Sequence, residues 1–316
     1  MKLFLTLAAA TAIAVPQLSA FDFQVKSIER VPVKNAMEVY HPVFTPDGKS
    51  LVVSSEAYNG LGIVNLENGD YKQLSDREGA GYKYAMNEDG TQIVLRENDF
   101  LTQKLSLYLV DVESAKEECI VPVAEHTNTL KLTGGVVAYA EPIEKKVLTR
   151  VDPALRNTLA AGTVASQPLL TEEDLKMVLY VDGKRTVVDP MLTATGRDDF
   201  QYCWSSISPD GSRLLFCAGN NTYTSDLDGG NLVDLGPIHA PVWRGDNTVV
   251  AMLDSDDGHF FTASDIVAAD AHTAERVQLT PQTDEIKMFP SVSPDGNRIA
   301  FHTTDGKLYI INLETK

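Results

Sequence analysis

The sequence predicts an all-β fold, a six-bladed β-propeller of four-stranded antiparallel blades, from three observations. A hairpin-like stretch recurs along the chain, and residues 289–301 are its clearest copy. A second pair of short strand-like segments follows most copies. The copies recur roughly every 40 to 50 residues, the period of β-propeller blades. Because a single blade of this size is marginally stable alone, its neighbours must stack against it around a common centre.

The recurring hairpin is a strand, a tight turn and a second strand. In the clearest copy, Ser293-Pro294-Asp295-Gly296 suits a type I turn that ends in a glycine with positive φ. The apolar run from Ile299 to Phe301 follows, as expected of a strand buried on both faces. Further copies begin at His41, Lys83, Trp204 and Ala240, and a weaker one at Leu130.

The outer strands complete each blade. Third strands are clearest at residues 107–112 and 308–313, and fourth strands end in Gln-Leu-Ser or Gln-Leu-Thr. Counting the hairpins gives six blades, and the last blade runs out of chain after its third strand. The alternating segment 23–31 precedes the first hairpin, so we expect it to supply the missing outer strand and close the ring. Such closure removes an exposed sheet edge.

The third blade is irregular. Residues 141–176 show no strand periodicity and predict an insertion between its second and third strands. Asp152-Pro153 could begin a short helix that runs to Leu159. Strand patterns resume at residues 177–181 and 184–188. A long insertion in a compact domain is usually functional or disordered. We therefore expect the rim of the propeller from which this insertion emerges to carry the binding face.

The Ser-Pro-Asp-Gly hairpin, the Leu-Tyr-x-x-Asp/Asn third strand and the Gln-Leu-Thr ending together resemble the TolB-type propeller repeat. The resemblance covers nearly all of residues 21–316 and implies the propeller portion alone. TolB proteins carry an N-terminal α/β domain, whereas here only segment 23–31 precedes the first blade. No single activity is implied, because the same propeller occurs in scaffolds, lyases and peptidases.

Residues 1–20 predict a cleaved signal peptide, and hence a periplasmic or secreted protein. Lys2 gives a basic start, residues 3–15 are apolar, and Leu18-Ser19-Ala20 forms a small-residue cleavage site. The apolar run is too short for a membrane span, and no other stretch is long and apolar enough. Residues 21–316 are then expected to form one propeller domain.

The overall charge restricts the partners. The chain has a formal net charge of −17, whereas nucleic acids and anionic membranes require clustered Lys and Arg. We therefore expect no nucleic-acid partner and no binding to anionic membrane surfaces. The lack of a second long apolar stretch separately predicts no membrane span in the mature chain.

Three cysteines are present. Cys203 and Cys217 lie on the two arms of one hairpin, where a cross-strand disulfide could join them in an oxidising compartment. Two buried free thiols are the alternative. Cys119 has no evident partner, and the chain has no C-x-x-C pattern for zinc or redox chemistry.

The loops that enter the blades converge on the central channel and carry the candidate binding residues. Aromatic and charged side chains at a channel mouth suit a site for a peptide, a sugar or a partner loop. Packing between blades is the alternative for each of them. The candidates are Tyr40, His41, Arg77, Tyr82, His126, Arg197, Tyr202, His239 and Lys287.

The sequence predicts no cofactor and no catalytic residues. It contains no His-Glu-x-x-His, Gly-x-Ser-x-Gly or phosphate-loop motif. We therefore expect an exported, non-catalytic propeller that binds a protein or peptide partner in the cell envelope. The alternative is a carbohydrate-active propeller, either similar to oligogalacturonate lyases or a glycan-binding protein. A metal held by His41, His126 and His239 would favour that alternative.

Overall fold

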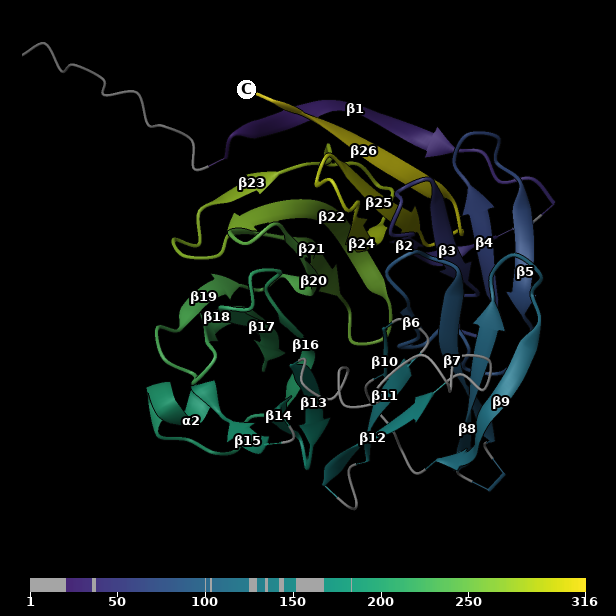
Figure 1. Ribbon diagram of the computed structural model, residues 1–316. Helices are drawn as coiled ribbons and strands as arrows, with labels where there is room; N and C mark the ends of the chain where they lie inside the picture. Colours follow the sequence, from purple (N-terminus) through teal and green to yellow (C-terminus); the bar gives the residue numbers. More distant parts are fainter. Residues whose placement is uncertain are drawn as a thin grey trace, which may run out of the picture.

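A computed structural model describes residues 21–35, 38–99, 101–102, 104–124, 130–133, 136–141, 145–151, 168–182 and 184–316. Across these residues the chain forms seven antiparallel sheets, which are arranged around a common centre as the blades of a β-propeller (Figure 1). The expected propeller fold is confirmed. The expected number of blades is wrong, because there are seven and not six.

The first two blades contain four strands each, with the first strand in sequence at one end of the sheet. Blade 1 contains β2 (Tyr40–Phe44), β3 (Ser50–Ser54), β4 (Leu61–Asn65) and β5 (Tyr71–Ser75). Blade 2 contains β6 (Ala85–Met86), β7 (Gln92–Asp99), β8 (Lys104–Asp111) and β9 (Glu117–Ala124).

The predicted insertion at residues 141–176 is the source of the wrong count. The described strands of blade 3 are β10 (Leu130–Thr133), β11 (Val136–Glu141) and β12 (Lys146–Val151). Blade 4 consists of β13 (Leu169–Glu173), β14 (Lys176–Val181) and β15 (Lys184–Val188). The supposed insertion therefore contains β12, the last described strand of blade 3, and β13, the first described strand of blade 4.

The reason for this error is the turn between β13 and β14. It is formed by Asp174 and Leu175, whose φ angles are 50° and 66°, in place of the Pro-Asp-Gly sequence that marks other blades. Segments 177–181 and 184–188 are consequently the second and third strands of blade 4, not the third and fourth of blade 3. The helix predicted to run from Asp152 to Leu159 lies outside the described residues.

A short helix, α2 (Pro190–Thr195), connects blades 4 and 5. The side chain of Asp189 accepts a hydrogen bond from the Leu192 amide, and Gly196 ends the helix with φ 74°. Across the described residues, no helix is long and apolar enough to cross a bilayer.

The last three blades again have four strands each. Blade 5 contains β16 (Tyr202–Ile207), β17 (Arg213–Ala218), β18 (Asn221–Asp226) and β19 (Val233–Gly236). Blade 6 contains β20 (His239–Arg244), β21 (Thr248–Asp256), β22 (Phe261–Asp270) and β23 (Arg276–Gln278). Blade 7 contains β24 (Lys287–Val292), β25 (Arg298–Thr303), β26 (Leu308–Thr315) and β1 (Phe23–Val31).

The ring closes as predicted, through the two ends of the folded chain. Strand β1 pairs antiparallel with β26, in a register that runs from Phe23 opposite Thr315 to Val31 opposite Leu308. Figure 1 shows β1 lying along the outer edge of this last blade. The amide of Lys316 also donates to the Asp22 carbonyl at 2.8 Å.

The recurring turn has the predicted geometry. Gly296 has φ 72°, and its amide donates to the Ser293 carbonyl at 2.8 Å. The Ser293 hydroxyl donates to Asp295, which holds the turn closed. Equivalent bonds close the turns that end at Gly48, Gly90 and Gly211.

Arginines connect neighbouring turns. Arg298 of blade 7 donates from Nη2 to the Gly48 carbonyl of blade 1 at 2.7 Å. Arg244 of blade 6 donates from Nε to the Gly296 carbonyl at 2.7 Å. The turns thus contribute both to their own hairpins and to contacts between blades.

Replacing Gly48 with alanine should lower the unfolding free energy more than replacing Gly211. Both glycines have positive φ, at 67° and 77°, so alanine is strained at either position by about 1 kcal/mol or more. A Cβ at residue 48 would also lie 2.8 Å from Nη2 of Arg298, whereas a Cβ at residue 211 meets nothing within 4 Å. Urea denaturation of both variants measures the difference, and equal losses would contradict the interblade contact.

Candidate binding site in the central channel

The first strands of four blades carry the same β-bulge. In β2, β16, β20 and β24, two residues of the first strand face a single residue of the second strand. The first of these two residues has a left-handed backbone in every case, with φ angles of 53° at His41, 51° at Trp204, 46° at Ala240 and 50° at Phe289. Such bulges bend a strand and redirect its side chains.

Lys83 completes the set. It precedes β6 and has φ 51°, and it stands seven residues before the turn glycine Gly90, as His41 stands before Gly48. We call His41, Lys83, Trp204, Ala240 and Phe289 the bulge ring. Proline follows three residues of the bulge ring, at positions 42, 241 and 290. Because proline has no backbone N–H, the interruption of strand pairing at the bulge leaves no donor unpaired at these positions.

The bulge ring lines a cavity of about 570 Å³, which we call the channel cavity. Residues from six blades line it, so the cavity lies at the centre of the propeller. Its wall is largely apolar and partly open to solvent, since Val43, Tyr82 and Trp204 are 44%, 41% and 43% exposed. Exposed apolar side chains around a concavity are typical of a binding surface.

The charges of this wall are paired. Nζ of Lys83 lies 3.3 Å from a carboxylate oxygen of Glu172, and Ser205 donates to the same carboxylate at 3.2 Å. The channel cavity therefore offers apolar surface with one neutralised ion pair.

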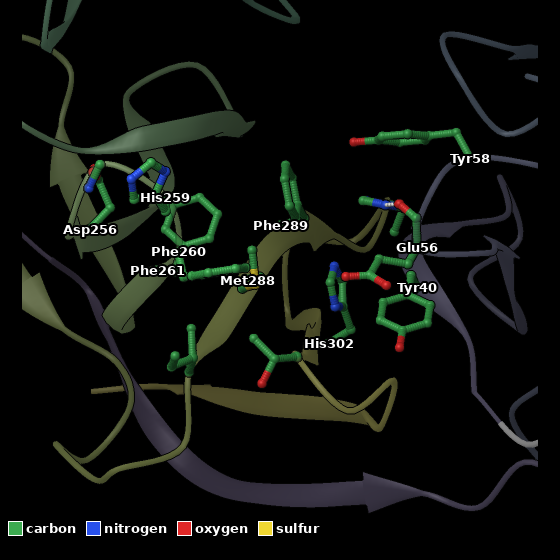
Figure 2. A pocket seen from close by; sticks show the side chains of 14 residues that line it. Tyr40, Glu56, Tyr58, Asp256, His259, Phe260, Phe261, Met288, Phe289 and His302 are labelled. Atoms are coloured by element: carbon green, nitrogen blue, oxygen red, sulfur yellow. Dashed lines mark hydrogen bonds between the residues drawn. The ribbon is translucent and has the colours of Figure 1, made fainter.

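A second cavity of about 690 Å³, the side cavity, adjoins the first and shares His41, Tyr58 and Phe289 with it. It lies at blades 7 and 1 and is bordered by the hairpin between β21 and β22. Figure 2 shows residues from these elements facing a common space. Its other lining residues are Tyr40, Glu56, Asp256, Gly258, His259, Phe260, Phe261, Ile286, Met288, His302 and Thr304.

Rings pack against one another at the boundary of the two cavities. The His41 ring stacks on Tyr58 with centroids 3.8 Å apart, and the Phe289 ring stacks on His302 at 5.5 Å. His41 and His302 meet edge to face at 5.0 Å. Two residues of the bulge ring, His41 and Phe289, are thus packed against Tyr58 and His302.

Both histidines favour the neutral form. Burial lowers the pKa of His302 to about 4 and also lowers the pKa of His41. Burial together with the neighbouring Glu38 carboxylate raises the pKa of Tyr40 to about 12.

Three of the nine candidate residues line the cavities, namely Tyr40, His41 and Tyr82. His239 lies beside the channel cavity, where its Nδ1 is 2.7 Å from Asp254 and its ring is 6.2 Å from that of Trp204. His126 lies outside the described residues.

The other four candidates make contacts away from the cavity walls. Arg77 pairs with Glu97 and Glu117 and covers the Tyr108 ring at 3.6 Å. Arg197 pairs with Asp199 at the surface. Tyr202 is buried and hydrogen bonds to Asp189, and Lys287 is buried against Asp265 at 2.8 Å.

Cys203 and Cys217 stand directly opposite each other in β16 and β17. Both are free thiols, with Cys203 exposed in the wall of the channel cavity and Cys217 buried. A hydrogen bond from Cys217 lowers the pKa of the Cys203 thiol. Cys119 is a free, exposed thiol on β9.

No group of three or more His, Cys, Asp or Glu side chains within the described ranges is placed to hold a metal ion. Of the three histidines proposed as ligands, His41 bonds the Glu56 carbonyl at 3.0 Å and His239 bonds Asp254.

Sequence reasoning missed Trp204, Phe289, Lys83, Tyr58 and His302 as cavity residues. A signal for three of them was present, because Lys83, Trp204 and Phe289 each open a copy of the repeat, as His41 does. Their shared position predicts a shared environment. Tyr58 and His302 do not open a copy of the repeat, and only the packing of the folded chain brings them to the cavity wall.

Comparison with known proteins supports the fold and no particular family. No protein-family model matches the sequence, and no curated protein matches it. By contrast, 1259 chains of solved structures match, which shows that the architecture is widespread. One is a chain from "Crystal Structure of Mitotic Checkpoint Complex", with a TM-score of 0.59 and 11% identity. The match covers 96% of this chain and 99% of that chain.

The buried His302 should make stability depend on pH. The pKa of His302 in the fold is about 4, below the usual 6.5, so the unfolded chain binds this proton more tightly than the folded protein does. The unfolding free energy therefore falls as the pH drops from about 6.5 to about 4. Between about pH 7.5 and about pH 5, the wild type should lose about 2 kcal/mol more unfolding free energy than His302→Gln. Urea denaturation at both pH values measures this, with His302→Phe as a second non-titrating variant. Parallel losses in all three proteins would contradict the assignment.

Proposed function

We propose that this protein is a non-catalytic propeller that binds a peptide segment of a protein partner in its central channel. The observation that carries the proposal is the bulge ring. Five blades place the first residue of their repeat in a left-handed conformation at the channel. A non-glycine residue in this conformation costs free energy, so its recurrence at one cavity favours a functional role.

The chemistry of the wall suits an extended peptide. Trp204, Tyr82 and Val43 offer partly exposed apolar surface, and rigid aromatic side chains are frequent anchors at protein interfaces. The paired charges of Lys83 and Glu172 can bond to peptide groups at the edge of this surface. The propeller fold is consistent with such a role, since one of the solved structures that share it is that of a complex.

The proposal places the protein outside the cytoplasm, in the cell envelope or secreted. The support is the signal-like pattern of residues 1–20. The folded domain includes Phe21, a residue that is 6% exposed and whose ring packs on Phe23 with centroids 5.4 Å apart. Cleavage before Phe21 would thus leave the propeller intact.

Membership of the TolB-like propellers is part of the same proposal. Its support is the sequence of the repeats, which includes Ser-Pro-Asp-Gly at residues 208–211 and 293–296. The seventh blade departs from the six that the count of hairpins predicted.

Alanine in place of either Trp204 or Phe289 of the bulge ring should weaken peptide binding. Peptides selected on the purified protein from a random library should bind Trp204→Ala and Phe289→Ala at least about tenfold more weakly, because each variant loses an aromatic anchor. Fluorescence anisotropy with labelled peptides measures the affinity, and circular dichroism checks the fold.

Leu101→Ala is the matched control. Leu101 is 97% exposed and lines neither cavity, so this variant should bind as the wild type does. Selected peptides that bind all four proteins equally would contradict the proposal, as would the failure of any library to yield a specific peptide.

A further inference from the structure

The side cavity differs from the channel cavity in charge. The carboxylates of Glu56 and Asp256 line it, and its described lining residues include no lysine or arginine. Both acidic residues are exposed at its rim. The chain as a whole carries a formal charge of −17. A cation is therefore attracted to this cavity, and an anion is repelled from it.

His302 contributes a hydrogen-bond acceptor that no described residue uses. The residue is 2% exposed, and its Nδ1 lies 3.1 Å from the Thr303 carbonyl. Because a carbonyl only accepts, Nδ1 carries the proton and Nε2 carries a lone pair. The Nε2 atom is buried and has no hydrogen-bond partner among the described residues.

His41 repeats this arrangement with its nitrogens exchanged. Its Nε2 lies 3.0 Å from the Glu56 carbonyl and so carries the proton. Its Nδ1 is buried and has no hydrogen-bond partner among the described residues. Two neighbouring imidazoles thus present acceptors without donors, and buried polar groups of this kind are normally satisfied.

Aromatic surface surrounds the two acceptors. Tyr58 stacks on His41, Phe289 stacks on His302, and Tyr40 meets His302 edge to face at 5.2 Å. The faces of such rings attract cations. Met288, Phe261 and the 77% exposed Phe260 add apolar surface beside them.

We propose that the side cavity binds a primary ammonium group, from a lysine side chain or the amino terminus of a peptide. An ammonium has three donors and no acceptor, and the side chains that line the cavity offer it acceptors at His41 Nδ1, His302 Nε2 and the Glu56 carboxylate. A carboxylate or phosphate would leave both imidazole acceptors unpaired and would face two like charges. The inference rests on the proposed function and specifies the chemistry of the peptide.

Three blocked or partly blocked pentapeptides test the inference. The first is acetylated and amidated Ala-Phe-Lys-Phe-Ala, and the second has norleucine in place of lysine. The third has norleucine and a free amino terminus, which separates the two sources of ammonium. Isothermal titration should show that the first or the third binds at least about tenfold more tightly than the second.

Two variants test whether the preference for an ammonium-bearing peptide depends on residues of the side cavity. Glu56→Gln and His41→Phe should each remove most of this preference, and phenylalanine already occupies the equivalent bulge position at residue 289. Glu67→Gln is the control, since it removes the same charge from an exposed residue that lines neither cavity, and it should retain the preference.

Equal affinities for the three peptides would overturn the inference, and so would no binding of any. If all three bound equally and Trp204→Ala abolished their binding, the proposed function would stand without an ammonium site. If the random library also yielded no peptide that binds the purified protein specifically, the result would contradict both the proposed function and the ammonium site.

Discussion

Pairing of β1 with β26 is the interaction on which the rest of the structure depends. Blade 7 receives three strands from the end of the chain and its fourth from residues 23–31. Without that strand, β26 would expose a row of unpaired backbone groups at the edge of its sheet. The pairing also brings Phe21 and Phe23 into a core cluster with Val250 of blade 6 and Ile299 of blade 7. Burying a phenylalanine contributes about 1.5 to 3 kcal/mol, so the closure stabilises the seam between these blades as well as the edge.

Closure of the ring gives the channel its wall. Only in a complete circle do the first strands of distant blades approach a common cavity, as His41 of blade 1 and Trp204 of blade 5 do. Bulges at matching positions then bring unlike residues to this wall, while the strands behind them keep the same buried pattern. The repeat thus supplies the same strand framework in each of these blades. The blades differ in which side chain occupies the bulge position.

The repeat chemistry explains how much of the fold could be predicted. Turns that end at Gly48, Gly211 and Gly296 have φ angles that favour glycine, so their sequence indicates their structure. The closing strand was predicted because its alternation and the short last blade agreed. Blades 3 and 4 were merged, since the Asp174-Leu175 turn reaches positive φ without glycine and leaves no signature in the sequence.

The site was predicted only in part, for a related reason. Tyr40, His41 and Tyr82 lie where loops meet first strands, and this placement brought them to the cavities. Tyr202 and Lys287 occupy similar sequence positions but are buried in contacts with Asp189 and Asp265. Whether a residue at such a position faces the channel depends on the bulge, and a bulge is a property of register that one strand's sequence does not specify.

Ring closure is tested most directly by a disulfide between the closing strands. Gln24 and Glu314 are exposed register partners whose side chains bond at 2.9 Å. In the Gln24→Cys and Glu314→Cys double variant, peptide mapping after mild oxidation should find these two residues linked. The link should raise the unfolding free energy by about 2 to 4 kcal/mol, because it constrains nearly the whole unfolded chain. Two unlinked thiols in a folded, oxidised protein would contradict the closed ring and, with it, the placement of the channel.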